Sequence, residues 1–301
     1  MLFPGPHLPT QIISDVLYDQ KQLCLSVLRL DAIHPVISGN KLFKLHYFLQ
    51  EAQQQSFEGI VTFGGPYSNH LVAAAYACKA AGIKSLGIIR GELPALLSHT
   101  LLACMEYGMS LRFMSRQDYN KKEDPDFLKK IQLKYNNFLL VPEGGYHPLG
   151  AAGASLIMNL IENDISHICC AVGTATTAAG LLQRLEKHQQ VIAVPVLKNM
   201  HDLEERVTFL TNRSFNNQQL TILNNYHFGG YAKKTEELID FMNLFYQKHK
   251  VPTDFVYTGK MMFAVNDLIK KDFFPRGSKI ICLHTGGLQG NLSLKSGVLC
   301  F

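Results

Sequence analysis

The chain has 301 residues, of which 47% are hydrophobic and 18% charged, a composition typical of globular proteins with one large domain or two ordinary ones. The net charge is +5, but the basic residues are scattered in pairs such as Lys121–Lys122 and Lys270–Lys271, so no nucleic-acid partner is predicted. No apolar run is long enough to span a membrane, and Met1–Pro9 lacks the basic and apolar regions of a signal peptide, so no membrane partner is predicted either.

The seven cysteines are odd in number and no pair has Cys-x-x-Cys spacing, so the sequence predicts neither a disulfide framework nor a metal site. Most of them lie in apolar runs, which favours buried, reduced thiols and a cytoplasmic location. The seven are Cys24, Cys78, Cys104, Cys169, Cys170, Cys282 and Cys300.

Short β-type runs alternate with helical patterns along most of the chain. In the first half we expect strands at 12–18, 23–30, 59–63, 85–89, 110–114 and 138–141. Helices are expected just after Lys41 and at 69–81, 95–107 and 126–135. In the second half we expect strands at 168–172, 191–194, 255–257 and 279–283, and helices at 149–161, 177–187, 202–211, 235–247 and 260–271. The polar segment 212–225 is predicted to be a surface loop with a short strand in it.

This alternation predicts an α/β fold in which parallel-rich sheets carry helices on both faces, giving three αβα layers. No Pro/Ser-rich linker is present, so we expect two lobes in close contact. The predicted large domain comprises residues 1–50 and 149–301, and residues 51–148 form a smaller inserted α/β domain. Because ligands of such sheets bind at the carboxyl ends of the strands, Gly64–Gly65, Gly173 and the 285–287 segment should share one cleft.

Lys41 follows Ser38-Gly39-Asn40 and precedes an amphipathic pattern inside an apolar neighbourhood. Burial disfavours the ammonium form of a lysine and lowers its pKa, which frees the nitrogen for Schiff-base chemistry. Lys41 is therefore a candidate carbonyl-capturing amine of a pyridoxal-phosphate enzyme. The alternative is a surface lysine next to a helix turn.

The loop after the strand 168–172 contains small residues and hydroxyls and opens a helix. Unpaired N–H groups at a helix start bind phosphate, and threonine hydroxyls add donors. The loop lacks a Walker lysine and strict Gly-x-Gly-x-x-Gly spacing, which argues against a nucleoside triphosphate and weakens a dinucleotide interpretation. A tight turn that needs small residues is the alternative. The candidate phosphate-binding residues are Gly173, Thr174, Ala175, Thr176 and Thr177.

The segment 64–70 also links a strand to a helix. Ser68 or Asn69 can cap that helix, and from the same position Asn69 could bind a phenolic oxygen and Ser68 a substrate carboxylate. His70 could act as a general base or be structural. A helix N-terminus disfavours its charged form.

Two further positions follow predicted strands. Tyr257 could transfer protons or bind a carboxylate, or it could simply pack. Thr285, before Gly286–Gly287, could donate a hydrogen bond to a ring nitrogen or cap a loop.

Four segments together resemble a known family. They are Gly39-Asn40-Lys41-Leu42-Phe43-Lys44-Leu45, Ser68-Asn69-His70, Tyr257-Thr258-Gly259-Lys260 and His284-Thr285-Gly286-Gly287. They resemble the 1-aminocyclopropane-1-carboxylate deaminase/D-cysteine desulfhydrase family, pyridoxal-phosphate enzymes of the tryptophan synthase β-like fold (fold type II). The resemblance covers nearly the whole chain in order, and Leu30-Asp31 resembles the family's Arg-Glu-Asp stretch imperfectly.

The resemblance implies how pyridoxal 5'-phosphate would be held. Lys41 would be the Schiff-base lysine, and Asn69 would bind the phenolic oxygen of the cofactor. The 173–177 backbone would cradle the phosphate, and Thr285 would partner the pyridine nitrogen.

It also implies a small amino-acid substrate and a homodimer. Ser68 would contact the substrate carboxylate, Tyr257 would be the catalytic tyrosine, and Tyr231 would be a second tyrosine of the cleft. Further candidate substrate contacts come from Asn69, His70, Tyr67 and Thr258. Whether Lys41 or Tyr257 takes the α-proton stays open.

Two positions bear on the substrate. The deaminase branch typically has Glu directly after the catalytic tyrosine and Leu before the glycine pair, where this chain has Thr258 and Thr285. These hydroxyls resemble the desulfhydrase branch, so we expect β-elimination from D-cysteine. Ring opening of 1-aminocyclopropane-1-carboxylate and cofactor binding without turnover are the alternatives. The chain departs from the family at Tyr67, where Gln is usual, and in a phosphate loop poorer in glycine.

Overall fold

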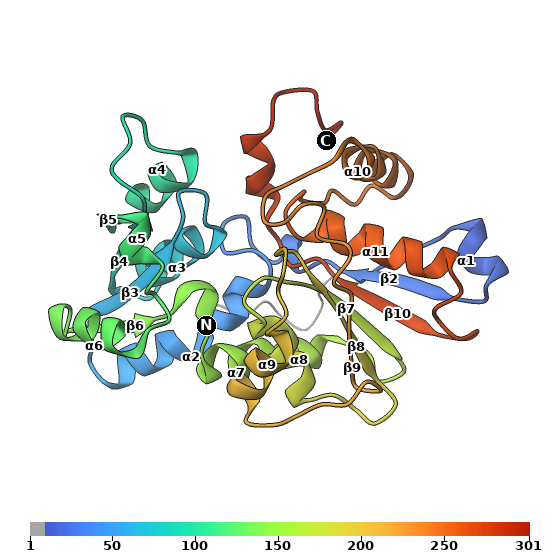
Figure 1. The fold of residues 1–301 in the computed structure, drawn as a ribbon, viewed down its shortest axis with the longest axis horizontal. Coiled ribbons are helices and arrows are strands. Elements are labelled where there is room, and N and C mark those ends of the chain that lie inside the picture. The colour runs from blue at the N-terminus through green and yellow to red at the C-terminus, as the bar shows by residue number, and fades with distance from the viewer. Residues whose placement is uncertain (1–9) are drawn as a thin grey trace.

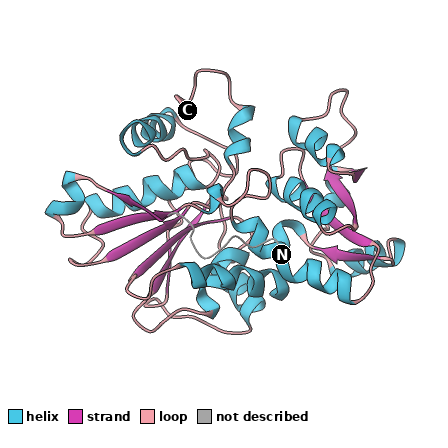
Figure 2. Cartoon of the chain, turned by 180° about the vertical axis from the view of Figure 1, so that it is seen from behind, coloured by secondary structure: helices cyan, strands magenta, loops and turns pink. Residues whose placement is uncertain are grey.

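The computed structural model describes residues 10–301, so the expectation for Met1–Pro9 lies outside the described part of the chain. Two β-sheets form two lobes side by side, with helices on both faces of each sheet (Figures 1 and 2). This confirms the predicted two-lobed α/β architecture. The exact domain limits stay a prediction.

The larger sheet has six strands in the order β1-β2-β10-β7-β8-β9. β1 pairs antiparallel with β2, and the other neighbours are parallel. The register places Cys282 of β10 opposite Val27 and Cys169. The strands are β1 (Thr10–Ile13), β2 (Cys24–Leu28), β7 (His167–Val172), β8 (Gln190–Pro195), β9 (Leu220–Ile222) and β10 (Lys279–Leu283).

The smaller sheet has four parallel strands in the order β5-β4-β3-β6. All residues of β3 are buried, as expected for a central strand covered on both faces. The strands are β3 (Gly59–Gly64), β4 (Lys84–Arg90), β5 (Met109–Met114) and β6 (Phe138–Val141).

Helices cover both faces of the larger sheet (Figure 1). One face packs against α1 (Val16–Gln20), α10 (Glu236–His249) and α11 (Thr258–Lys270). The other packs against α7 (Pro148–Ser155), α8 (Thr176–Gln183) and α9 (Leu203–Thr211).

The smaller sheet is covered by α3 (Asn69–Ala80) and α4 (His99–Glu106) on one face and by α5 (Arg116–Tyr119) and α6 (Pro125–Lys134) on the other. Helix α2 (Asn40–Gln54) belongs to a hydrophobic cluster that includes residues of both lobes. Short 3-10 turns are η1 (Leu30–Ala32), η2 (Glu143–Gly145), η3 (Leu156–Leu160) and η4 (Leu288–Ser293).

The helix starts differ in how they are capped. Ser68, Ser98, Asp124 and Thr235 accept a backbone N–H at the starts of α3, α4, α6 and α10. The N-cap residues of α2 and α8 are Gly39 and Ala175, and neither helix has a side-chain cap. The first N–H groups of α8 are therefore available to another acceptor.

Three predicted elements are wrong in part. The strand expected at 12–18 ends at Ile13, because the Asp15 carboxylate accepts the N–H of Leu17 and starts α1. The helix expected from Ala95 begins at His99, after the cap Ser98. The strand expected at 255–257 is a turn, because the Asp254 side chain binds backbone N–H groups that a neighbouring strand would need.

The helix expected at 149–161 is α-helical only to Ser155 and continues as the 3-10 helix η3, and the helix expected at 177–187 ends at Gln183. The remaining predicted helices and strands are confirmed with small shifts at their ends, and 212–225 contains the short strand β9. Five of the seven cysteines are buried, whereas Cys24 and Cys300 are exposed. None of the helices within residues 10–301 combines the length and apolar character needed to cross a membrane.

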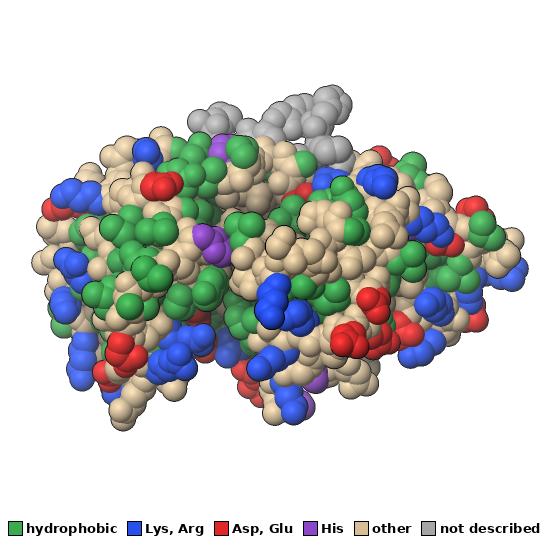
Figure 3. Space-filling view, turned by 90° about the horizontal axis from the view of Figure 1, so that it is seen from above, with side chains coloured by type: hydrophobic (Ala, Val, Ile, Leu, Met, Phe, Trp, Pro, Cys, Tyr) green, Lys and Arg blue, Asp and Glu red, His purple; other side chains and the backbone are tan. Residues whose placement is uncertain are grey.

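The face seen from above carries interspersed acidic and basic side chains, with hydrophobic ones gathered over the small lobe (Figure 3). Four exposed hydrophobic residues of that lobe lie in α4 and the loop before it: Leu93, Leu96, Leu102 and Met105.

Candidate active site

Lys41 lies at the start of α2, where three distant segments meet. The backbone of Gly39 packs against Thr285 so closely that a Cβ atom at position 39 would lie 2.0 Å from the Thr285 carbonyl oxygen. Asn40 donates from its side chain to the Thr177 hydroxyl at 2.7 Å. The start of α2 is therefore fixed to the loop after β10 and to the first turn of α8, and it brings Lys41, Thr177 and Thr285 into one site.

The Lys41 amine is held inside this site. Its Nζ donates to the Asn40 side-chain oxygen at 2.5 Å and lies 6.0 Å from the centre of the Tyr257 ring. Burial lowers the pKa of Lys41 to about 8, and the negative charge of Asp254 opposes that shift. A larger fraction of neutral amine is therefore present near neutral pH than for a solvated lysine.

The loop between β7 and α8 has the features of an anion site. Ala175 adopts φ 67° and ψ −15°, a left-handed conformation that is rare outside glycine, asparagine and aspartate. The Thr174 and Thr176 hydroxyls are hydrogen bonded at 2.9 Å. Because the α8 start has no side-chain cap, its N–H groups and positive dipole end can bind a phosphate.

Tyr257 lies beside this loop. A Cβ atom at Gly173 would lie 3.3 Å from the Tyr257 ring, so a larger residue there would crowd the ring that packs on this backbone. Burial raises the pKa of Tyr257 well above its usual value, and Tyr231, Asp254 and Glu143 raise it further. Tyr257 is therefore a protonated phenol at neutral pH, between Lys41 and the anion loop.

Tyr231 is the neighbour of Tyr257. The two ring centres are 6.1 Å apart in an edge-on arrangement of 73°. Burial raises the pKa of Tyr231, whose side chain remains 46% exposed, so its ring borders solvent on one side and Tyr257 on the other.

The loop between β3 and α3 carries the candidate site residues of the smaller lobe. Ser68 is the N-cap of α3 and its hydroxyl accepts from Leu71 N at 3.4 Å. The side-chain oxygen of Asn69 is buried and has no hydrogen-bond partner among residues 10–301. A buried polar atom without a partner is costly, so Asn69 has the chemistry of a residue that binds a cofactor or substrate.

His70 is held as a neutral ring. The Thr62 hydroxyl donates to the Val141 carbonyl at 2.8 Å, so it must accept from Nε2 of His70 at 2.9 Å. Burial and the charges of Lys41 and Lys44 lower the pKa of His70 to about 3. His70 is thus a weak base at neutral pH, and its buried Nδ1 is a free acceptor.

The other three candidates differ in exposure. Tyr67 is 55% exposed and its ring centre lies 5.8 Å from that of His99. Thr285 is buried next to Gly39. Thr258 is fully buried, and its hydroxyl donates to the Asp254 carboxylate at 2.6 Å. Asp254, rather than the cleft, is thus the hydrogen-bond partner of Thr258.

Two residues of this region were missed from the sequence. Lys44 lies one turn after Lys41, is 5% exposed, and its stem packs beside Gly145. Burial lowers the pKa of Lys44 well below its usual value, with Lys41 adding to the effect. The three-residue spacing of the two lysines on one helix was the available signal, since such residues share a face.

Asp254 is the second residue missed. It is fully buried, and its carboxylate accepts the backbone N–H groups of Val256, Tyr257 and Thr258 as well as the Thr258 hydroxyl. An aspartate shortly before a helix start is a capping signal. It was not recognised because residues 255–257 were expected to form a strand.

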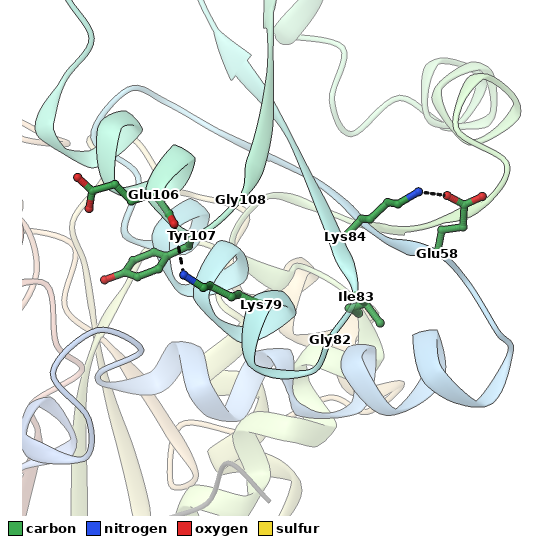
Figure 4. A pocket seen from close by; sticks show the side chains of 8 residues that line it. All are labelled: Glu58, Lys79, Gly82, Ile83, Lys84, Glu106, Tyr107 and Gly108. Atoms are coloured by element: carbon green, nitrogen blue, oxygen red, sulfur yellow. Dashed lines mark hydrogen bonds and ion pairs between the residues drawn. The ribbon is translucent and has the colours of Figure 1, made fainter.

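A hollow on the small lobe lies away from these loops (Figure 4). Its lysines already have partners, because Lys84 pairs with Glu58 at 2.7 Å and Lys79 donates to the Glu106 carbonyl at 3.4 Å. It lies at the amino ends of β4 and β5, the edge opposite to the one at which α/β sheets bind ligands. The lining residues are Glu58, Lys79, Gly82, Ile83, Lys84, Glu106, Tyr107 and Gly108.

Comparison with known proteins shows the family of this chain. The family described as "Pyridoxal-phosphate dependent enzyme" matches residues 18–286. A putative 1-aminocyclopropane-1-carboxylate deaminase of Pyrococcus furiosus is 30% identical over 283 residues, covering 88% of this chain and 85% of the relative. A D-cysteine desulfhydrase of Klebsiella pneumoniae is 27% identical over 271 residues, covering 83% of each chain.

Among solved structures, a homologue of 1-aminocyclopropane-1-carboxylate deaminase has a TM-score of 0.79 at 24% identity, covering 97% of this chain and 92% of that one. This likeness shows the shared fold, including the expected tryptophan synthase β-like architecture. The chain therefore belongs to the pyridoxal-phosphate dependent enzymes, and within them to the 1-aminocyclopropane-1-carboxylate deaminase/D-cysteine desulfhydrase family.

Proposed function

We propose that this enzyme eliminates the β-substituent of a small D-amino acid, with D-cysteine as the representative substrate. D-cysteine and water would give pyruvate, sulfide and ammonia. The similarity to a D-cysteine desulfhydrase and the hydroxyls at positions 258 and 285 support this choice of branch.

The residues present fit pyridoxal phosphate. The unpartnered Asn69 oxygen and the uncapped start of α8 are both explained by a ligand with a phenolic and a phosphate group. Lys41 would hold the aldehyde carbon, Asn69 the phenolic oxygen and Thr285 the ring nitrogen. The 173–177 amides would hold the phosphate, with the buried Lys44 as its counter-charge.

The bound cofactor supplies an electron sink for charge that develops at the substrate α-carbon. We assign the α-proton to Lys41, because an amine with a pKa of about 8 is a competent base near neutral pH. Tyr257 keeps its proton at neutral pH, since burial raises the pKa of its phenol, and its O–H can donate a hydrogen bond to the departing sulfur. Ser68 would bind the substrate carboxylate from the opposite lobe.

One observation carries the choice between branches. Both oxygens of the Asp254 carboxylate are occupied by four donors from residues 256–258. The Asp254 carboxylate therefore has its hydrogen bonds within the 254–258 turn and is not available to the cofactor. The Thr285 hydroxyl would then be the partner of the cofactor's ring nitrogen. A hydroxyl strengthens the electron sink less than a carboxylate would, which suits expulsion of a thiolate better than opening of a cyclopropane ring.

The first alternative is deamination of 1-aminocyclopropane-1-carboxylate to 2-oxobutanoate and ammonia, which the name of the Pyrococcus furiosus relative favours. The second is a protein that binds pyridoxal phosphate without turnover. The presence of Lys41, Ser68 and Tyr257 together argues against the second alternative.

The test has two arms. Purified protein should show the visible absorption of a lysine-bound cofactor, and Lys41→Ala should abolish it, whereas Lys79→Ala, at an exposed position on α3, should not. Sulfide and pyruvate from D-cysteine are then assayed beside 2-oxobutanoate from the cyclopropane substrate. Formation of 2-oxobutanoate alone would overturn the branch, and a cofactor band without either product would favour the non-catalytic alternative.

A further inference from the structure

Lys260 is a buried lysine that the reaction above does not use. It lies in the first turn of α11, three residues after Tyr257, and is fully buried. Its Nζ donates to two main-chain carbonyls of one loop, those of His227 at 2.9 Å and Gly230 at 2.8 Å. Burying an ammonium group is costly unless it is well hydrogen bonded, so these two bonds account for its position.

The loop that Lys260 holds carries Tyr231. Residues 223–235 contain neither helix nor strand, and Phe228, Gly229 and Gly230 all have positive φ values of 50°, 89° and 115°. Its own backbone bonds are turn bonds, among them Gly230 N–H to the His227 carbonyl at 3.0 Å and Lys233 N–H to the Gly230 carbonyl at 3.1 Å, and neither ties the loop to α11. Tyr231 follows Gly230 directly, so the bond from Lys260 to the Gly230 carbonyl lies next to the residue that carries the phenol.

Tyr257 is fixed from the same helix start. The Asp254 carboxylate accepts the Tyr257 N–H at 2.8 Å and the Thr258 N–H at 2.9 Å. Two buried side chains near the start of α11 therefore hold the two tyrosines. Asp254 binds the backbone of Tyr257, and Lys260 binds the loop that carries Tyr231. The resulting separation of the two ring centres is 6.1 Å.

We propose that Lys260 is a positioning residue that ties the 227–231 loop to helix α11 and thereby sets Tyr231 against Tyr257 in the active site. It acts through backbone carbonyls and does not touch the substrate. The catalytic consequence rests on the proposed function, in which Tyr257 donates a hydrogen bond to the leaving group, whereas the structural consequence does not.

The experiment compares Lys260→Met and Lys260→Gln with wild type and with Lys270→Met, an exposed lysine near the other end of the same helix. Amide hydrogen exchange of the cofactor-loaded protein is followed by mass spectrometry for the 227–231 loop and, as an internal reference, for α10. Turnover is measured per bound cofactor.

We expect exchange of the 227–231 loop to become at least about ten-fold faster in Lys260→Met, with α10 unchanged, because the loop loses both bonds to α11. In Lys260→Gln the amide can restore one bond, so the increase should be smaller. Turnover should fall about 100-fold in Lys260→Met, the loss typical of a reacting group misplaced by about 1 Å. Lys270→Met should match wild type in all three measurements.

Unchanged exchange in the loop, or an equal rise in the loop and α10, would overturn the proposal. If Lys260→Met does not fold, the same comparison is made with Lys260→Gln. If the wild-type protein turns over neither D-cysteine nor 1-aminocyclopropane-1-carboxylate, the proposed function fails. The exchange result still decides whether Lys260 holds the loop.

Discussion

Gly39 offers the sharpest test of how the site is built, because its backbone joins the start of the Lys41 helix to the Thr285–Gly286 loop. Its φ of 71° and ψ of −153° lie in a region almost restricted to glycine, at a cost of about 1–3 kcal/mol for other residues. In Gly39→Ala the new Cβ would also lie 2.0 Å from the Thr285 oxygen and 2.7 Å from Gly286 N.

The size of the effect follows from these distances. The Cβ–oxygen distance must grow from 2.0 Å to at least about 3.0 Å, so the loop at 285–286 must move, and overpacking of this kind typically costs about 1–3 kcal/mol. Alanine also makes the unfolded chain less flexible than glycine does, which stabilises the folded state by about 0.4–1 kcal/mol. Gly39→Ala should therefore lower the free energy of unfolding by about 1–6 kcal/mol.

Gly82→Ala is the matched control. Gly82 has nearly the same φ, 70°, but nothing within 4 Å of an added Cβ. It should cost no more than about 1–2 kcal/mol. Urea unfolding of the cofactor-free proteins gives both values, and titration with pyridoxal phosphate gives the affinities. Only Gly39→Ala should lose affinity, because Lys41 and Thr285 are forced apart. Equal losses of stability with unchanged affinity in both variants would refute the reasoning.

Three further predictions concern the charges of the site. Lys44→Met should weaken cofactor binding by about 10–100-fold, which is the contribution of a charge-assisted hydrogen bond. It should also raise the melting temperature of the cofactor-free protein, because it removes a buried amine. Equal cofactor affinity in the variant and the wild type would contradict a role of Lys44 in binding the phosphate. Because burial lowers the pKa of Lys41 to about 8, cofactor uptake by the cofactor-free protein should accelerate up to about that pH and level off above it, whereas a rate still rising to pH ~10 would mean a solvated amine. Thr258→Glu should destabilise the fold by about 3–5 kcal/mol in urea unfolding, since a second carboxylate meets Asp254, and Thr258→Ser should retain most of the stability; a stable Thr258→Glu enzyme that opens the cyclopropane ring would show that Asp254 tolerates it.

Local pattern was sufficient for most of the elements. The alternation of buried strands with amphipathic helices predicted the sheet of 59–141 and the strands β7, β8 and β10, because side-chain period is a local property. It failed where one side chain bonds to the nearby backbone. Asp15 starts a helix inside an expected strand, and Asp254 replaces an expected strand with a turn.

The kind of site could be predicted, because the sequence shows a lysine after a glycine turn and small-residue loops after the predicted strands. The roles assigned to Lys41, Asn69, Tyr257 and Thr285 stay predictions until the variants are measured. The burial of Lys44 and Lys260 could not be predicted from the sequence, because long-range packing decides whether a lysine is solvated or buried.

The amino-acid sequence was sufficient to predict the class of fold, the order of most elements and the family of the chemistry. Tertiary structure decided the distances and the charges: it placed Gly39 against Thr285, linked Asn40 to Thr177, and set the Lys41 amine 6.0 Å from the Tyr257 ring. The physical reason is that hydrophobic periodicity acts between near neighbours in the chain. A pKa, by contrast, depends on burial and on charges that only the folded chain brings together.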